Sequence, residues 1–219
     1  MFKLWGDNLK IKSIRVQNNG YVHCRSNFYS AHDLFPGDSA FVFSGGVNRL
    51  VGEIDSGNWA VSYLLSMYQY RPKDFVLFDR PEVVIDHKVV LLKELSKHTC
   101  YMDQLDPLFS GHASVKKLVI QGLKHSNLNY SSDDIRNLFC IDNERFERPL
   151  SGVGNEIFKA MAAIGLSNEK EIFCFPWMSV MRFDGYHKSL TFALEKLSEL
   201  EKIIILPVGR GKNGDNSLS

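Results

Sequence analysis

Two glycines stand five residues apart in this chain, Gly52 and Gly57, after an apolar stretch from Val47 and before an apolar helical pattern that ends at Met67. This is the glycine spacing of a phosphate-binding loop, G-x-x-x-x-G-K-[ST], in which backbone N–H groups at a helix N-terminus surround phosphates. An ordinary strand–turn–helix can carry the same glycines, so the spacing alone leaves both interpretations open. The candidate nucleotide-binding positions are Gly52, Asp55, Ser56, Gly57, Asn58 and Trp59.

The charged groups that phosphoryl transfer requires are missing from this loop. The lysine of the motif is replaced by Asn58, and the hydroxyl that holds Mg²⁺ is replaced by Trp59, which cannot bind a metal. Glu53 and Asp55 add negative charge where a triphosphate would lie. Backbone donors would still attract phosphate, but we expect ATP to bind poorly here and no metal to bind.

Composition narrows the class of protein. The chain has 219 residues, which suits one large α/β domain with a helical insert, and its 44% hydrophobic content supports a sizeable core. A formal net charge of +1 argues against a nucleic-acid-binding surface. The four cysteines are scattered without a CxxC pair, and no apolar run is long enough to span a membrane. These features predict a cytoplasmic protein without direct membrane insertion.

The order of the predicted elements indicates an α/β fold. Alternating residues and turn signals between Leu9 and Phe43 predict antiparallel strands. The segment 113–139 has helical spacing, with Ser131 as a helix N-cap. Later elements are a helix through Phe158 to Ile164, a strand at 171–175, a helix at 190–200 and a strand at 202–208. We predict a single domain over 1–208, with a helical subdomain at about 106–150, and a flexible tail at 209–219.

Three further segments could take part in chemistry. The apolar run that ends at Asp79 could be a Mg²⁺-binding strand, although it follows the glycine loop so closely that a short structural strand is the favoured interpretation. Gln104 is a single glutamine after a predicted strand. The third segment opens a predicted helix and comprises Leu150, Ser151, Gly152, Val153 and Gly154. Ser151 there would also suit an ordinary helix N-cap.

Taken together and in this order, these segments resemble the nucleotide-binding domain of an ABC transporter over most of the chain. Residues 52–59 correspond to its P-loop, Gln104 to its Q-loop glutamine, residues 150–154 to its LSGGQ signature, and the strand at 172–175 to Walker B. The resemblance implies a P-loop NTPase-like core with an N-terminal antiparallel β part and a helical subdomain. It also implies partners, namely a second ABC ATPase domain, in a homodimer or heterodimer, and a membrane permease subunit.

Departures from the family pattern indicate a degenerate site with no ATPase activity of its own. No carboxylate occurs between Ile172 and Arg182, where Walker B requires an aspartate and a glutamate, and Cys174, Phe175 or Pro176 takes the aspartate position. The switch histidine is absent after the last strand, which continues into Gly209-Arg210. The signature could still serve a partner's ATP, because its role needs backbone N–H groups and a small hydroxyl.

Three functions therefore stay open. The first is a catalytically degenerate cassette subunit of a transporter, peripheral at the inner face of the membrane. The second is a soluble regulatory or interaction protein of the same fold without a transport role. The third is an enzyme of another class that uses Cys174 or His187, for which the sequence offers no nucleophile–base arrangement.

Overall fold

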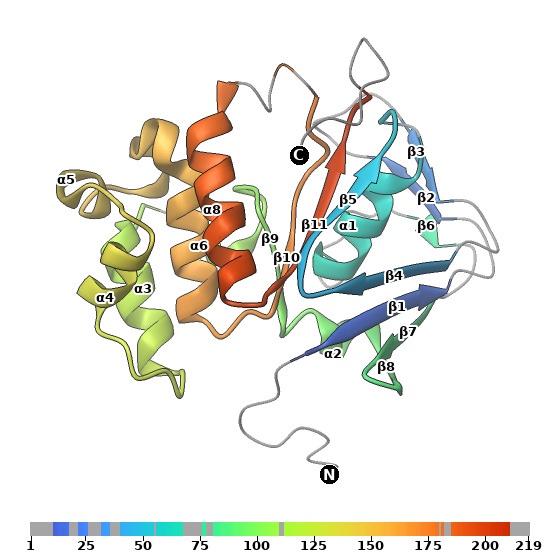
Figure 1. The fold of residues 1–219 in the computed structure, drawn as a ribbon, viewed down its shortest axis with the longest axis horizontal. Helices are drawn as coiled ribbons and strands as arrows, with labels where there is room; N and C mark the ends of the chain where they lie inside the picture. The colour runs from blue at the N-terminus through green and yellow to red at the C-terminus, as the bar shows by residue number, and fades with distance from the viewer. Residues whose placement is uncertain are drawn as a thin grey trace.

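The computed structural model describes residues 11–17, 22–25, 32–35, 40–54, 56–67, 76–77, 81–109, 112–179, 181 and 185–210. A parallel sheet lies at its centre (Figure 1). Helices α6 (Ile157–Ser167) and α8 (His187–Glu199) cover one face and α1 (Asn58–Met67) covers the other. The predicted turn at 36–38, Asp55, Asp79 and the tail from residue 211 fall outside these residues.

The parallel sheet has the strand order β5-β11-β10-β9. Its strands are β5 (Gly46–Val51), β9 (Thr99–Tyr101), β10 (Ile172–Cys174) and β11 (Ile203–Val208). Every residue of β9, β10 and β11 is buried, as expected for parallel strands covered on both faces. Side chains alternate between the two faces. Phe173 and Ile204 face α6 and α8, whereas Cys174 and Ile205 face α1.

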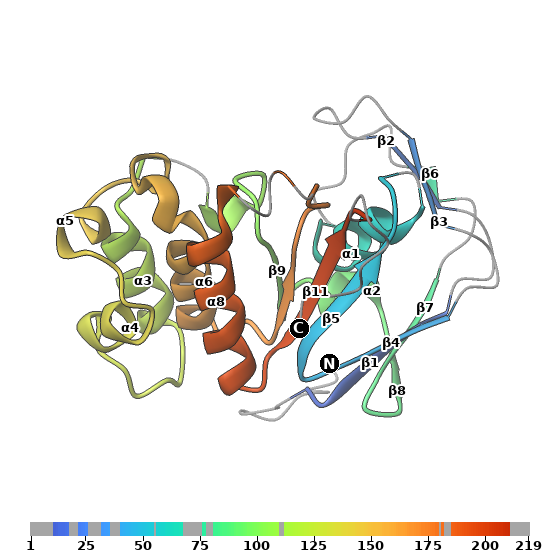
Figure 2. The same ribbon diagram turned by 45° about the horizontal axis from the view of Figure 1, so that its top comes forward.

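Antiparallel strands form two further sheets on the α1 side (Figure 2). One has the order β4-β1-β7-β8 and the other β3-β2-β6. Their strands are β1 (Ser13–Gln17), β2 (Val22–Arg25), β3 (His32–Phe35), β4 (Ala40–Ser44), β6 (Val76–Leu77), β7 (Glu82–Ile85) and β8 (Lys88–Val90). Ile14, Val16 and Phe43 from the first sheet share a core cluster with α1. The N-terminal antiparallel prediction is therefore confirmed.

Helices account for most of the remainder. They are α1 (Asn58–Met67), α2 (Leu92–Leu95), α3 (Val115–Lys124), α4 (Ser132–Leu138), α5 (Asn143–Phe146), α6 (Ile157–Ser167) and α8 (His187–Glu199), with 3₁₀ turns η2 (Pro107–Phe109), η3 (Leu150–Gly152) and η4 (Gly154–Glu156). Ser131 caps α4 through a capping box with Asp134, as its sequence predicts. Helices α3, α4 and α5 gather beyond α6, away from the parallel sheet (Figures 1 and 2).

One predicted boundary was wrong. Helix α8 begins at His187 rather than at Leu190, because its first turn is polar and leaves no apolar period to detect. Before it, the stretch 88–97 contains β8, which pairs with β7, and the short helix Leu92–Leu95. The strand from 202 was placed correctly, and β11 continues through Pro207 beside β5.

Candidate nucleotide site and signature turn

The glycine loop lies where its motif requires, between the carboxyl end of β5 and the first turn of α1. Gly57 has φ +86°, a left-handed conformation that L-residues rarely adopt. Gln104 lies in an exposed turn just after β9, at the carboxyl edge of the same parallel sheet. In open α/β sheets this edge is where ligands bind.

The loop's own side chains pack closely around Gly52. A Cβ placed on Gly52 would lie 2.6 Å from Asn58 Nδ2, and Ser56 Oγ is in contact with the same position. The Ser56 hydroxyl donates instead to the carbonyl oxygen of Glu53, at 2.6 Å. The glycines of a phosphate-binding loop exist so that a ligand can approach the backbone closely. Here Ser56 and Asn58 of the same loop lie beside that glycine.

Trp177, which follows β10, also contacts the glycine loop. Its indole N–H donates to the carbonyl oxygen of Gly52 at 3.0 Å, across 125 residues of sequence. A Cβ on Gly209 would lie 3.1 Å from the Trp177 ring, so the indole also packs beside the end of β11. Trp177 therefore stands between the Walker B-like segment and the glycine loop. Sequence reasoning missed it, because only the pairing of β10, β11 and β5 brings these segments together.

Trp59 does not face a ligand. It is 2% exposed and belongs to the core cluster on the α1 face of the sheet. Its indole N–H donates to the Tyr101 hydroxyl at 2.9 Å, and its ring lies 5.1 Å from that of Tyr63. The residue in the metal-hydroxyl position is thus part of the hydrophobic core.

The Walker B-like strand offers no charged group at the sheet edge. Cys174 faces α1, where burial raises its pKa to about 12. The carbonyl oxygen of Phe175 accepts a hydrogen bond from Ser62 Oγ at 2.5 Å. Across the described ranges, His, Cys, Asp and Glu side chains form no group of three that could hold a metal ion. His187 lies on α8 at the other face of the sheet, so the structure does not bring Cys174 and His187 together.

The buried carboxylate of Asp106, which the sequence analysis did not single out, holds the turn that carries Gln104. Asp106 is 6% exposed, and its two oxygens accept from the N–H groups of Tyr101 at 2.6 Å and Leu108 at 2.9 Å. Burial raises its pKa above the ordinary value, and the two hydrogen bonds oppose that rise. Its position before Pro107 was the available signal, since Asp commonly accepts from backbone N–H groups at such turns.

The signature segment departs from its predicted geometry. Ser151 does not begin a helix, because it lies in the 3₁₀ turn η3, whose cap position is Pro149, and α6 starts only at Ile157. Val153 is fully buried and Gly154 has φ +58°, which interrupts any continuous helix between them. Ser151 and Gly152 remain exposed on this turn.

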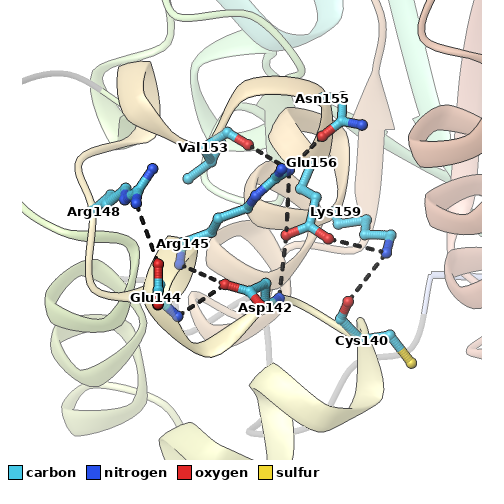
Figure 3. Close-up of polar contacts among 9 residues, drawn as sticks. All are labelled: Cys140, Asp142, Glu144, Arg145, Arg148, Val153, Asn155, Glu156 and Lys159. Atoms are coloured by element: carbon cyan, nitrogen blue, oxygen red, sulfur yellow. Dashed lines mark hydrogen bonds and ion pairs between the residues drawn. The ribbon is translucent and has the colours of Figure 1, made fainter.

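Arg145 fixes the end of this turn (Figure 3). Its guanidinium donates to the carbonyl oxygen of Val153 at 3.2 Å and also to Asn155 Oδ1. Glu156 lies 3.9 Å from Arg145 and 3.6 Å from Lys159, so its carboxylate is shared between two cations. Leu150 and Val153 belong to the core cluster on the α6 face of the sheet, opposite Trp59. Leu150 and Val153 of the signature turn therefore lie on the opposite face of the sheet from Trp59, which follows the glycine loop.

Solved structures share this architecture. The first is a putative ABC transporter ATP-binding protein from Pyrococcus furiosus, with a TM-score of 0.60 and 15% identity over 92% of this chain and 93% of that one. The chain has the fold of an ABC transporter ATP-binding domain. The ATP-binding cassette MJ0796, solved as a dimer bound to ADP and Pi, gives a TM-score of 0.56 at 13% identity over 92% and 89% of the two chains.

A bacterial Atm1-family ABC exporter with ATP bound gives a TM-score of 0.54 at 12% identity and covers 93% of this chain but 35% of its own. No protein-family model and no curated protein sequence matches the chain. Within the described residues, none of the helices is long and apolar enough to cross a membrane. The predicted fold class is confirmed. The nucleotide, signature and partner roles remain predictions.

Proposed function

We propose that this chain is a non-hydrolysing ATP-binding-cassette subunit that pairs with an active ATPase domain, a membrane permease, or both. The observation that carries the proposal is the packing of the glycine loop. Ser56 and Asn58 lie beside Gly52, and the Gly52 carbonyl oxygen is held by Trp177. A Mg²⁺-nucleotide would lack the charged contacts of an active site here, because the lysine, the metal hydroxyl and every Walker B carboxylate are absent.

Loss of these groups together would remove hydrolysis. Deleting one charge-stabilising group from an active site costs on the order of a hundredfold in rate or more. Purified chain should therefore release no phosphate from ATP above background. Asn58→Lys alone should not restore activity, because Trp59 lies in the core and no carboxylate replaces Walker B. Steady phosphate release that disappears on changing Asn58 or Gln104 would contradict the proposal.

The signature turn gives such a subunit a remaining role. Ser151 and Gly152 are exposed, and Arg145 holds the turn that carries them. MJ0796 was solved as a nucleotide-bound dimer and the Atm1-family protein is an exporter. In this proposal Ser151 and Gly152 contact ATP held by a partner, and the chain lies in the cytoplasm at the inner face of the membrane through its partners.

Three variants test the pairing in a complex isolated from native membranes. Ser151→Arg should abolish the ATPase activity of the complex, because a long cation would block contact at the turn. Asn58→Ala should leave that activity nearly unchanged. Asn129→Arg, which adds the same side chain at an exposed loop position, is the matched control. If Ser151→Arg and Asn58→Ala have equal effects, or the chain always purifies alone, the soluble regulatory function replaces this one.

A further inference from the structure

A hollow outside the nucleotide loop lies at the N-terminus of α8. It has a volume of about 320 Å³, within the range of roughly 300–1,000 Å³ that small-molecule sites occupy. Of the residues that the structure describes, five consecutive ones at the start of α8 line it together with Asn155, which lies just after the signature turn. The lining residues are Asn155, Gly185, Tyr186, His187, Lys188 and Ser189.

Two backbone N–H groups at the helix end beside this hollow have no acceptor within the described part of the chain. Tyr186 occupies the cap position of the 13-residue helix without a side-chain cap hydrogen bond. The intrahelical bonds begin with Leu190 N–H to the Tyr186 carbonyl oxygen. Among the described residues, the N–H groups of Lys188 and Ser189 donate to no acceptor. Such N–H groups, with the positive end of the helix dipole, favour a bound anion.

The hydroxyl of Ser189 provides a second, independent sign of a ligand. Ser189 is 5% exposed and lines the hollow, and its Oγ has no hydrogen-bond partner. Buried hydroxyls nearly always have a partner, since an unmade hydrogen bond costs free energy. The hydroxyl turns about one bond, so an oxygen in the hollow would satisfy it together with the two N–H groups.

Charges around the hollow also favour an anion. Lys188 is an exposed cation on the wall. Arg145 is bonded to Asn155, and the carboxylate of Glu156 is already paired with Arg145 and with Lys159. Tyr186 anchors the helix end, because its ring packs edge-on against Phe158 at 5.5 Å. The donors are thus presented from a fixed position.

We propose that this hollow binds a phosphate group, either inorganic phosphate or the terminal phosphate of a nucleotide. The Ser189 hydroxyl, the N–H groups of Lys188 and Ser189, and the Lys188 ammonium supply donors to a tetrahedral oxyanion, whose several oxygens can accept from all of them. The site differs from the glycine loop and from Ser151, and it does not depend on the function proposed above.

Calorimetric titration of the purified full chain tests the site, with inorganic phosphate, ADP and ATP as separate ligands. Wild-type protein should bind phosphate saturably with one site per chain. Ser189→Ala and Lys188→Gln should each weaken binding by about five- to tenfold. Lys196→Gln removes the same charge at the far end of α8 and should bind as the wild type does. If inorganic phosphate binds as tightly as ATP, the natural ligand of the hollow is free phosphate. If ATP binds much more tightly, the ligand is the terminal phosphate of a nucleotide.

Melting temperatures of the same variants show whether a loss of binding reflects unfolding. Ser189→Ala removes an unsatisfied hydroxyl, so without phosphate this variant should have a melting temperature equal to or above that of the wild type. Added phosphate should raise the melting temperature of the wild type but not that of Ser189→Ala. If Ser189→Ala fails to fold, the comparison of phosphate binding by Lys188→Gln and Lys196→Gln tests the site in its place. No saturable binding of any of the three ligands, or equal binding by all variants, would overturn the site.

Discussion

Trp177 and Gly52 are joined by a hydrogen bond of 3.0 Å between the indole N–H and the glycine carbonyl oxygen, although 125 residues separate them. The bond links the segment after β10 to the loop after β5, the two strands that flank β11. An aromatic side chain from one segment therefore holds the backbone of the other.

Removing that side chain should open the loop. Trp177→Ala takes away the indole that covers Gly52, so we expect nucleotide to bind more tightly than to the wild type, by up to about tenfold. No hydrolysis should appear. Fluorescence titration with a labelled ATP analogue measures the affinity. The control Trp177→Phe keeps a ring and loses the N–H donor, so it should resemble the wild type. If the two variants bind nucleotide equally, ring bulk does not close the loop.

The Trp59–Tyr101 hydrogen bond should stabilise the fold. Tyr101→Phe removes the acceptor of a buried indole N–H at a position that is 1% exposed. Loss of such a bond typically lowers the free energy of unfolding by about 1–3 kcal/mol. Urea unfolding followed by tryptophan fluorescence measures the change. Tyr130→Phe, at a 42% exposed position, is the matched control and should change stability little. Equal effects of the two substitutions would show that the Trp59–Tyr101 bond contributes nothing.

Reactivity toward a thiol reagent should distinguish the exposed Cys140 from the buried Cys100 and Cys174. Cys140 is exposed, whereas Cys100 and Cys174 are fully buried. Burial raises the pKa of Cys100 well above its ordinary value and that of Cys174 to about 12, so neither forms thiolate at neutral pH. In a Cys24→Ser background, Ellman's reagent should react rapidly with one thiol and with two more only after unfolding. Fast labelling of Cys174 would revive the hypothesis that it is a nucleophile.

Stability should fall as the pH is lowered from 7 toward 5. The pKa of His98 lies below its ordinary value of 6.5, first because the ring is partly buried and second because Lys170 and Lys97 repel the imidazolium. Between the folded-state pKa and 6.5 the unfolded chain binds more protons, so acid favours unfolding there. Below the folded-state pKa the loss should level off. Asp106, with a raised pKa, acts in the opposite direction at more acidic pH.

Urea unfolding of wild type and His98→Gln across this pH range measures the effect. The variant lacks the titrating ring, so its stability should depend less steeply on pH between 5 and 7. An unchanged slope would show that other groups cause the acid sensitivity.

Several features of the chain follow from the sequence by itself. The strand before Gly52, the helix after Gly57 and the late strands could be predicted, because apolar periodicity and glycine spacing report local conformation. The family resemblance and the absence of a lysine at position 58 can likewise be read from the amino-acid sequence. The predicted fold class was therefore correct.

Only the tertiary structure decided how the sites are built. It placed Trp177 over Gly52 and Trp59 against Tyr101, since both bonds depend on which strands are neighbours in the sheet. It also placed Ser151 in a 3₁₀ turn and not at the start of a helix, because burial of Val153 and the positive φ of Gly154 outweighed the local capping preference. Local propensity is worth about a kilocalorie per residue, and packing between distant segments overrides it.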